Sequence, residues 1–190
     1  MLDRLAAQGL IVADAGYGRS VSFRLALEER GWSYMAAVDP REIARPAAAE
    51  PFQPVYGRLG PPTLPRYREA AKPLMTFVDA DARFESVTRC QGSKGAMTSR
   101  FVVLEVRLSG KEASRTAQEK AGGRSRWNGV RPLLVERPEE ATEPTGYWMT
   151  NLPVATPVTD LVRWAKRRRH TGPARCRARY PAGQPGGADS

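Results

Sequence analysis

Asp14 is the residue whose type and position could do chemistry. It stands in the stretch IVADAGYGRS, directly after the apolar run at 10–13 and before Gly16 and Gly18. A carboxylate at the C-terminal end of a buried strand lies in the crevice where open α/β sheets bind ligands. An aspartate there can equally accept a hydrogen bond from the backbone two residues on and close a turn. The stretch by itself leaves catalysis, metal binding and a turn open.

Gly16 and Gly18 also allow a dinucleotide-binding interpretation. They lie between an apolar run and a helical pattern, and Asp39 ends the next apolar run about twenty residues later, as a ribose-binding acid does. That fingerprint needs a small residue three positions after Gly18, where this chain has Val21. The pattern is incomplete, and a dinucleotide-binding α/β enzyme is the weaker alternative.

Two further candidates are weak. The stretch GSKG at 92–95 could bring Lys94 to a phosphate, but its residue order is not that of a P-loop and favours a hairpin turn. His170 has no nucleophile near it in the sequence. Cys90 and Cys176 form no metal-binding spacing, which indicates reduced thiols and a cytoplasmic protein.

The positive charge is concentrated near the C-terminus. From Arg163 onward eight lysines and arginines stand against one acid, Asp189, so this segment supplies +7 of the formal net charge of +10. Such a block is typical of a surface that contacts phosphate backbones, or of a solvated tail. The predicted DNA-binding residues are Arg163, Lys166, Arg167, Arg168 and Arg169.

The elements that must position Asp14 are a strand, a helix and a second strand. Residues 2–8 have the leucine spacing of a helix end, which Gly9 would terminate. A buried strand follows at 10–13, then a helix capped by Ser20 and closed by Gly31. The run WSYMAAVD is the second buried strand, so the segment predicts a βαβ unit with parallel strands.

The middle of the chain has a different character. Residues 40–73 hold half of the 16 prolines and predict a long surface loop. The runs FESVTRC, RFVVLEVRLS, VRPLLVER and GYWMTNLP predict strands, and the alternation around Glu105 places Val102, Leu104, Val106 and Leu108 inward. Residues 109–129 are polar and predict a loop.

The last regular element is a helix over TPVTDLVRWAKRRR. Thr156 can cap it, Pro157 suits its first position, and its apolar residues share one face. Gly172 and Pro173 end the pattern, and the following residues predict a disordered basic tail at 169–190. No apolar run approaches the roughly 20 residues needed to cross a bilayer, so we expect no membrane partner.

Read together, these pieces resemble a known family. VADAGYG, QGSKGAMTSRFVVLEVR, GYWMTNLP and TPVTDLVRWAKRR occur in the order seen in bacterial insertion-sequence transposases of the DDE type, and the resemblance spans about residues 2–168. It implies a ribonuclease-H-like fold with a β-rich insertion. It also implies two Asp and one Glu that hold two Mg²⁺ ions for DNA cleavage and strand transfer, with transposon ends and target DNA as partners.

By that resemblance Asp14 matches the second metal-binding Asp. The first Asp belongs to an earlier strand that this sequence does not contain, and the position expected to carry the Glu is Gly172. We therefore expect a DDE transposase fragment, truncated at both ends and inactive, with Mg²⁺ binding doubtful. The tail composition is that of GC-rich DNA read in a shifted frame. A basic, non-specific DNA-binding remnant is the second interpretation.

The expected fold class is thus α/β, a partial ribonuclease-H-like fold. Its core comprises residues 1–39 and 153–168. An insertion spans 40–152, with a Pro-rich loop at 40–73 and mainly β structure at 75–152, and the tail follows at 169–190.

Overall fold

The computed structural model describes residues 3–5, 9–52, 54–55, 66–79, 82–92, 95–109 and 129–167. Most of the loop predicted over 109–129 and all of the tail predicted over 169–190 lie outside the described residues.

The described part is a mixed α/β fold with a central, mostly antiparallel sheet and few helices. Its elements in chain order are β1 Asp3–Leu5, β2 Leu10–Ala13, α1 Ala15–Gly18, α2 Val21–Glu29, β3 Ser33–Ala37, β4 Ile43–Pro46, β5 Pro51–Phe52, β6 Arg66–Tyr67, β7 Lys72–Pro73, the 3₁₀ helix η1 Leu74–Phe77, β8 Glu85–Gly92, β9 Gly95–Leu108, β10 Val130–Pro138, β11 Gly146–Thr150 and α4 Val158–Ala165.

The predicted βαβ unit is confirmed. β2 and β3 are parallel neighbours, and α2 connects them. The Ser20 side chain accepts a hydrogen bond from the Phe23 amide and caps α2, as expected. At the other end Gly31 has φ +68, while its amide and that of Trp32 donate to the carbonyls of Glu28 and Leu27. This is a Schellman ending, in which the left-handed residue is usually glycine.

The helix predicted over residues 2–8 is wrong at Asp3–Leu5, which form strand β1. Asp3 pairs with Val12 and Leu5 with Leu10, antiparallel along the edge of β2. Gly9, with φ +62, lies in the turn between the two strands. The leucine spacing suits a helix, but the open edge of β2 offers backbone hydrogen bonds that local propensity does not anticipate.

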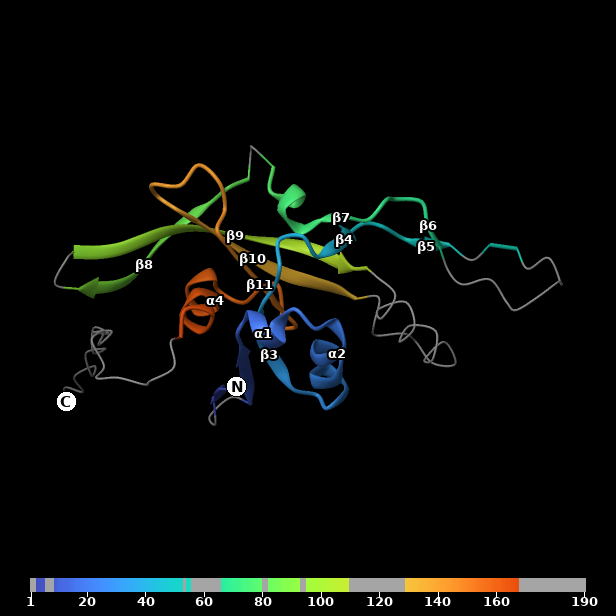
Figure 1. The fold of residues 1–190 in the computed structure, drawn as a ribbon, viewed down its shortest axis with the longest axis horizontal. Helices are drawn as coiled ribbons and strands as arrows, with labels where there is room; N and C mark the ends of the chain where they lie inside the picture. The colour runs from blue at the N-terminus through green and yellow to red at the C-terminus, as the bar shows by residue number, and fades with distance from the viewer. Residues whose placement is uncertain are drawn as a thin grey trace, which may run out of the picture.

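One sheet joins the βαβ unit to the later strands. Its order is β1-β2-β3-β11-β10-β9-β4-β7, and β8 pairs with the first half of β9. Figure 1 shows the β8–β9 hairpin extending at one end of the long axis and β5–β6 at the other. The predicted hairpin at 92–95 is confirmed, because Gly92 pairs with Gly95.

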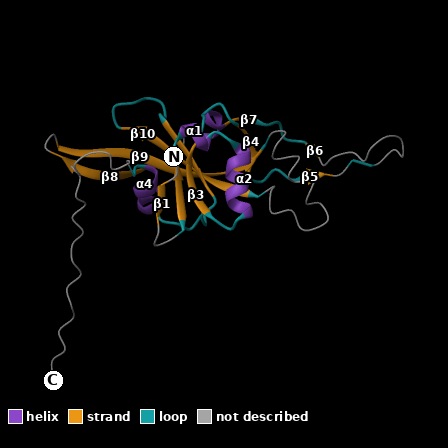
Figure 2. Cartoon of the chain, turned by 60° about the horizontal axis from the view of Figure 1, so that its bottom comes forward, coloured by secondary structure: helices purple, strands orange, loops and turns teal. Residues whose placement is uncertain are grey.

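The sheet is covered on both faces. Leu25 of α2 packs with Val102, Val106 and Leu108 on one face. Leu161 of α4 packs with other sheet residues in a separate cluster, and Figure 2 shows α2 and α4 as separate helices against the strands.

The predicted alternation on β9 is confirmed. Val102, Val106 and Leu108 are buried, Leu104 is partly buried, and Glu105 is exposed. The sequence did not reveal that the opposite side of β9 is also covered at one end. Phe101 is fully buried there, in the cluster that contains Leu161.

The Pro-rich segment contains more structure than predicted. β4 pairs with β9 and β7, and Ala44 is fully buried, so part of the expected surface loop is sheet. Prolines stand where these strands end or begin: Pro46 ends β4, Pro73 ends β7 and Pro51 begins β5. A missing amide N–H costs least at such positions, which reconciles the prolines with strands.

Helix α4 forms where predicted, and its apolar face is confirmed by the burial of Leu161 and Val162. Thr156 does not cap it, because the Thr156 hydroxyl donates to the Pro153 carbonyl at 2.6 Å. Pro157 is the N-cap residue instead. No helix in the described ranges has both the length and the apolarity to cross a membrane.

Truncating Leu134, which packs in the same hydrophobic cluster as Leu161 of α4, should strongly destabilise the fold. Leu134 is fully buried in β10, and Leu134→Ala should lower the free energy of unfolding by about 2–5 kcal/mol because a cavity remains. Val55→Ala, at a side chain that is 96% exposed, should change it by less than about 0.5 kcal/mol. Urea unfolding of both variants measures the difference, and equal midpoints would contradict the assigned burial.

Candidate functional site at the carboxyl ends of β2 and β3

Two aspartates follow the parallel strands β2 and β3. Asp14 comes directly after β2, and Asp39 comes two residues after the end of β3. Because Ala13 pairs with Ala36, the carboxyl ends of both strands meet at one edge of the sheet. The predicted position of Asp14 at the end of its strand is confirmed, and this edge is where α/β folds bind ligands.

The Asp14 carboxylate takes part in the turn that it begins. Its Oδ1 accepts a hydrogen bond from the Gly16 amide at 3.0 Å, and its carbonyl accepts from the Gly18 amide at 2.7 Å. Asp14 is therefore the N-cap of the four-residue helix α1, and its side chain is exposed. This is the Asx-turn that the sequence offered as one of the roles of Asp14.

Gly18 brings this turn against β3. A Cβ on Gly18 would come 2.0 Å from the carbonyl oxygen of Ala37, closer than any side chain permits. The close approach requires glycine because the obstacle is backbone. The second glycine of AGYG therefore has a packing reason that needs no ligand.

A buried ion pair holds the end of the same turn. Arg24 of α2 is fully buried, and its Nη1 donates to the Gly18 carbonyl at 2.6 Å. The guanidinium also binds both carboxylate oxygens of Glu42, which lies just before β4. Charge-assisted bidentate pairs of this kind fix geometry more strongly than neutral hydrogen bonds. Arg24 thus connects α1, α2 and the chain beyond β3.

Asp39 is engaged by neighbouring residues. Its Oδ1 accepts from the Arg41 amide at 2.9 Å, and its Oδ2 lies 3.5 Å from Nη2 of Arg19. The Arg19 side chain is 62% exposed, so this pair is screened by solvent. Asp39, which the dinucleotide-binding alternative assigns to a ribose, thus already contacts Arg19 and Arg41.

The residues that the structure describes do not fit a two-metal centre. No group of three or more His, Cys, Asp or Glu side chains that could hold a metal ion occurs among the described residues. Mg²⁺ sites in proteins rely on carboxylate oxygens in near-octahedral geometry. Asp14 contributes one carboxylate, which already accepts the Gly16 amide.

The described members of the predicted DNA-binding set, Arg163, Lys166 and Arg167, lie at the C-terminal end of α4 or directly after it. Arg163 and Arg167 are exposed. Lys166 is the C-cap residue of α4. Arg168 and Arg169 lie outside the described residues.

Lys166 is drawn into the fold. Its Nζ binds the buried carboxylate of Glu136 and lies 4.5 Å from the centre of the Trp148 ring. Gly146 makes room for that ring, since a Cβ there would approach a Trp148 carbon to 2.3 Å. The Lys166 charge is therefore largely balanced within the protein.

The sequence reasoning missed the Arg24–Glu42 pair. The sequence carried a signal for it. Arg24 lies on α2 next to Leu25 and three residues after Val21, which places it toward the inward side of the helix, and Glu28 follows four residues later. An arginine on the apolar side of a helix, with an acid after the next strand, is the pattern of a buried ion pair.

Comparison with known proteins gives one family. A family model described as DDE superfamily endonuclease matches residues 1–98, more than half of the chain. Those residues include the complete β2–α2–β3 unit and the Asp14 turn. A search of curated proteins found no match.

Removing the Arg24 charge should destabilise the fold far more than removing the Arg19 charge. Arg24→Met leaves Glu42 and the Gly18 carbonyl without a partner, which should cost about 3–5 kcal/mol. Arg19→Met removes an exposed pair and should cost less than about 1 kcal/mol. Guanidinium unfolding curves give both values.

The single variant Glu42→Gln and the double variant Arg24→Met/Glu42→Gln complete a double-mutant cycle for this pair. The loss in the double variant should be clearly smaller than the sum of the two single losses, because the pair acts as a unit. Additive losses would show that Arg24 and Glu42 do not support each other.

Proposed function

The chain belongs to the DDE superfamily endonucleases, and from that premise we propose that it is a transposase-type protein that binds DNA but does not cut or join it by itself. Members of this superfamily act on DNA and generally use divalent metal ions. The observation that carries the proposal is the combination of the family match with a candidate centre that has a single turn-forming carboxylate.

The proposal includes a ribonuclease-H-like core. We assign residues 1–39 and 153–168 to it, and 40–152 to an insertion within it. The parallel β2–α2–β3 unit and the packing of α4 beside Met35 of β3 support this division. The antiparallel strands of the proposed insertion connect to the core because β11 pairs with β3.

The lack of strand cleavage follows from ligand number. Phosphodiester displacement in this class needs two metal ions roughly 3.5–4 Å apart, on the attacking and leaving oxygens. In the described part of the chain, Asp14 is the one carboxylate that matches the DDE pattern. Asp39 follows the other strand and is held by Arg19 and Arg41, and Glu105 is exposed on β9, in the proposed insertion.

DNA binding is assigned to the basic end of α4 and the residues after it. Arg163 and Arg167 are exposed there, and the segment from Arg163 onward holds +7 of the net charge of +10. Contacts of this kind neutralise phosphates and release counterions, so they carry no sequence preference and depend strongly on salt. Sequence-independent binding is also the activity expected of the remnant interpretation.

Purified protein should not nick supercoiled plasmid in the presence of Mg²⁺ or Mn²⁺. A site with one carboxylate should hold neither metal pair nor reacting phosphate, so wild type and Asp14→Ala should be equally inactive. Gel analysis of the plasmid after prolonged incubation is the measurement. Metal-dependent nicking that is lost in Asp14→Ala would show that the missing ligands come from residues assigned elsewhere.

Replacing Arg167, Arg168 and Arg169 with alanine should weaken DNA binding equally for all sequences. If each contacts one phosphate, the plot of log affinity against log salt should become shallower by about 2.7. Lys166 stays unchanged so that its pair with Glu136 persists. Fluorescence anisotropy with two unrelated duplexes is the assay. An affinity that changed neither with salt nor with this substitution would show that these residues do not contact DNA.

A further inference from the structure

A second basic surface lies far from the end of α4. Strands β5 and β6 form a small antiparallel ribbon separate from the main sheet, with Pro51 opposite Tyr67 and Phe52 opposite Arg66. We call the described residues of this ribbon and its root, 45–52 and 66–72, the arm. Figure 1 shows the arm projecting from the molecule at the end opposite the β8–β9 hairpin.

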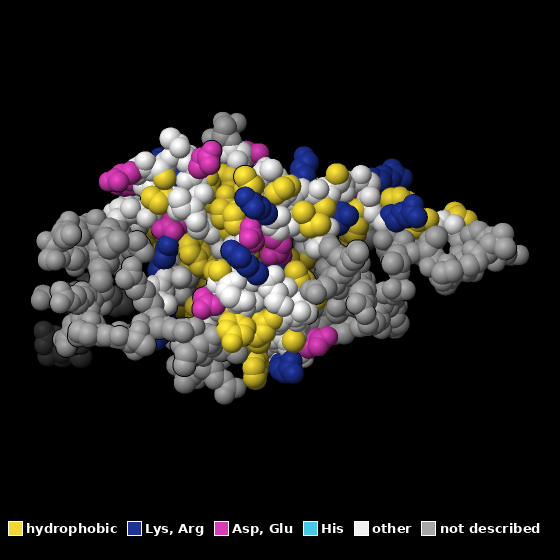
Figure 3. All heavy atoms as spheres, viewed as in Figure 1, with side chains coloured by type: hydrophobic (Ala, Val, Ile, Leu, Met, Phe, Trp, Pro, Cys, Tyr) yellow, Lys and Arg dark blue, Asp and Glu magenta, His cyan; other side chains and the backbone are white. Residues whose placement is uncertain are grey.

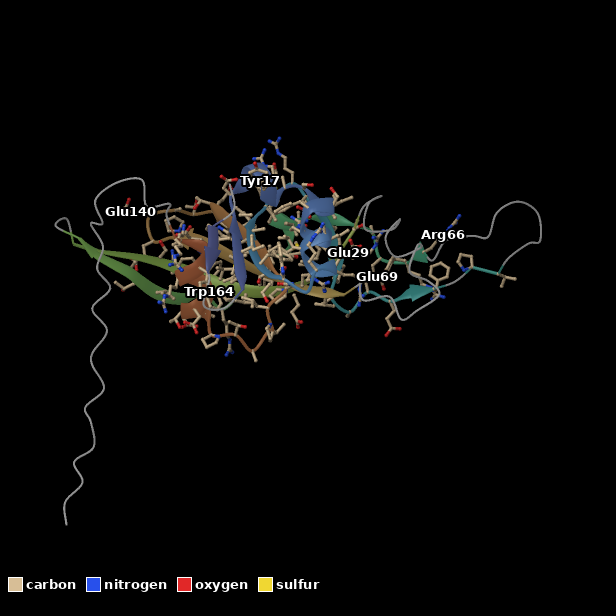
Figure 4. All side chains as sticks on the ribbon, turned by 90° about the horizontal axis from the view of Figure 1, so that it is seen from below. Tyr17, Glu29, Arg66, Glu69, Glu140 and Trp164 are labelled. Atoms are coloured by element: carbon tan, nitrogen blue, oxygen red, sulfur yellow. The ribbon has the colours of Figure 1, made fainter. Side chains whose placement is uncertain are left out.

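The two faces of the arm are set by the two-residue period of a strand. In β6, Arg66 and Tyr67 lie on opposite faces, and Arg68 follows in the bend after the strand. Arg68 lies over the ring of Phe52, with 5.4 Å between its Cζ and the ring centre. Both arginines are exposed, and Figure 4 shows Arg66 farther out along the arm than Glu69.

The other side of the arm is also basic at its root. Arg45 lies over the Tyr67 ring, 4.6 Å from its centre, and its Nε donates to the Glu69 carbonyl at 3.1 Å. Its Nη1 donates to the Ser109 hydroxyl. The register places Arg45 directly opposite Arg107, which donates to the Ala47 carbonyl.

Two arginines opposite each other on paired strands repel. The contacts described for Arg45 are to a ring, a carbonyl and a hydroxyl, none of which carries a negative charge. In Figure 3 Lys and Arg side chains lie among hydrophobic ones over β4–β7. The exposed acids of the arm are Glu50 and Glu69, fewer than its basic residues. The described residues of the arm therefore carry a net positive charge, which suits an anionic partner.

We propose that the arm contacts the phosphate backbone of duplex DNA through Arg66 and Arg68. This inference rests on the DNA binding proposed above and adds a second contact surface to it. Aromatic rings stacked under guanidinium groups restrict the arginines and leave their outward N–H groups for phosphate oxygens. Arg45 lies over the Tyr67 ring and Arg68 over the Phe52 ring, which remains 39% exposed, so we expect the guanidinium groups to meet the phosphates and position the duplex.

The test compares charge-matched variants of the full chain. Arg66→Gln/Arg68→Gln removes the two exposed charges of the arm. Arg30→Gln/Arg83→Gln removes two exposed charges from the end of α2 and from the segment before β8. Arg66→Lys/Arg68→Lys keeps the charge without the planar group. Anisotropy with a short duplex of arbitrary sequence, over a series of salt concentrations, gives affinities and salt slopes, and thermal unfolding checks that each variant folds.

We expect the glutamine variant of the arm to bind more weakly and its salt slope to become shallower by about 1.8, the value for two lost phosphate contacts. The lysine variant should keep the wild-type slope, and the Arg30/Arg83 variant should change it by much less. Equal salt slopes for the arm variant and the Arg30/Arg83 variant would overturn the proposed DNA contact of the arm, and the DNA binding proposed above would still stand. Wild-type protein that shows no DNA binding would overturn both the arm and the proposed function.

Discussion

The fold depends on β3 being shared by two kinds of pairing. It is parallel to β2 on one side and antiparallel to β11 on the other. Side chains at and just after the end of β11 reinforce the junction. The Thr150 hydroxyl donates to the Tyr34 carbonyl at 2.5 Å, and the Asn151 side chain accepts from the Tyr34 amide and donates to the Trp32 carbonyl. This junction joins segments more than 100 residues apart, and the position of α4 and of the long antiparallel strands follows from it.

Buried charge reinforces the same framework. Glu28 of α2 accepts hydrogen bonds from the Tyr34 hydroxyl and from Arg131 of β10, so helix, β3 and β10 meet at one carboxylate. Burial, followed by the charge of Glu28, raises the pKa of Tyr34. The folded state therefore favours the neutral phenol, and this contribution to stability is present below the ordinary tyrosine pKa and is lost as pH rises above it. With Arg24–Glu42, α2 is held by two ion pairs, and the partner in each comes from the chain after β3.

Local patterns predicted the elements well and their partners poorly. Ser20, Gly31 and the alternation through Val106 each depend on near neighbours, so the α2 caps and the β9 register were predictable. The β1 strand was not predictable, because its pairing with the open edge of β2 outweighs the helical leucine spacing, and the pairing of β4 with β9 was not, because it joins segments far apart in the sequence. At the candidate site the position of Asp14 was predictable from the strand that precedes it. The partners of Lys166 were not, since Glu136 and Trp148 come from strands that local sequence does not place beside α4.

The turn at Asp14 has structural roles that need no metal ion. The Asp14 carboxylate caps α1, Gly18 packs on the β3 backbone, and Arg24 fixes the Gly18 carbonyl. Each of these contacts stabilises the fold and involves no metal ion. The stretch DAGYG therefore has structural reasons of its own for each of these residues. The family model matches residues 1–98 as a whole, and two-metal catalysis in that family needs carboxylates in addition to Asp14.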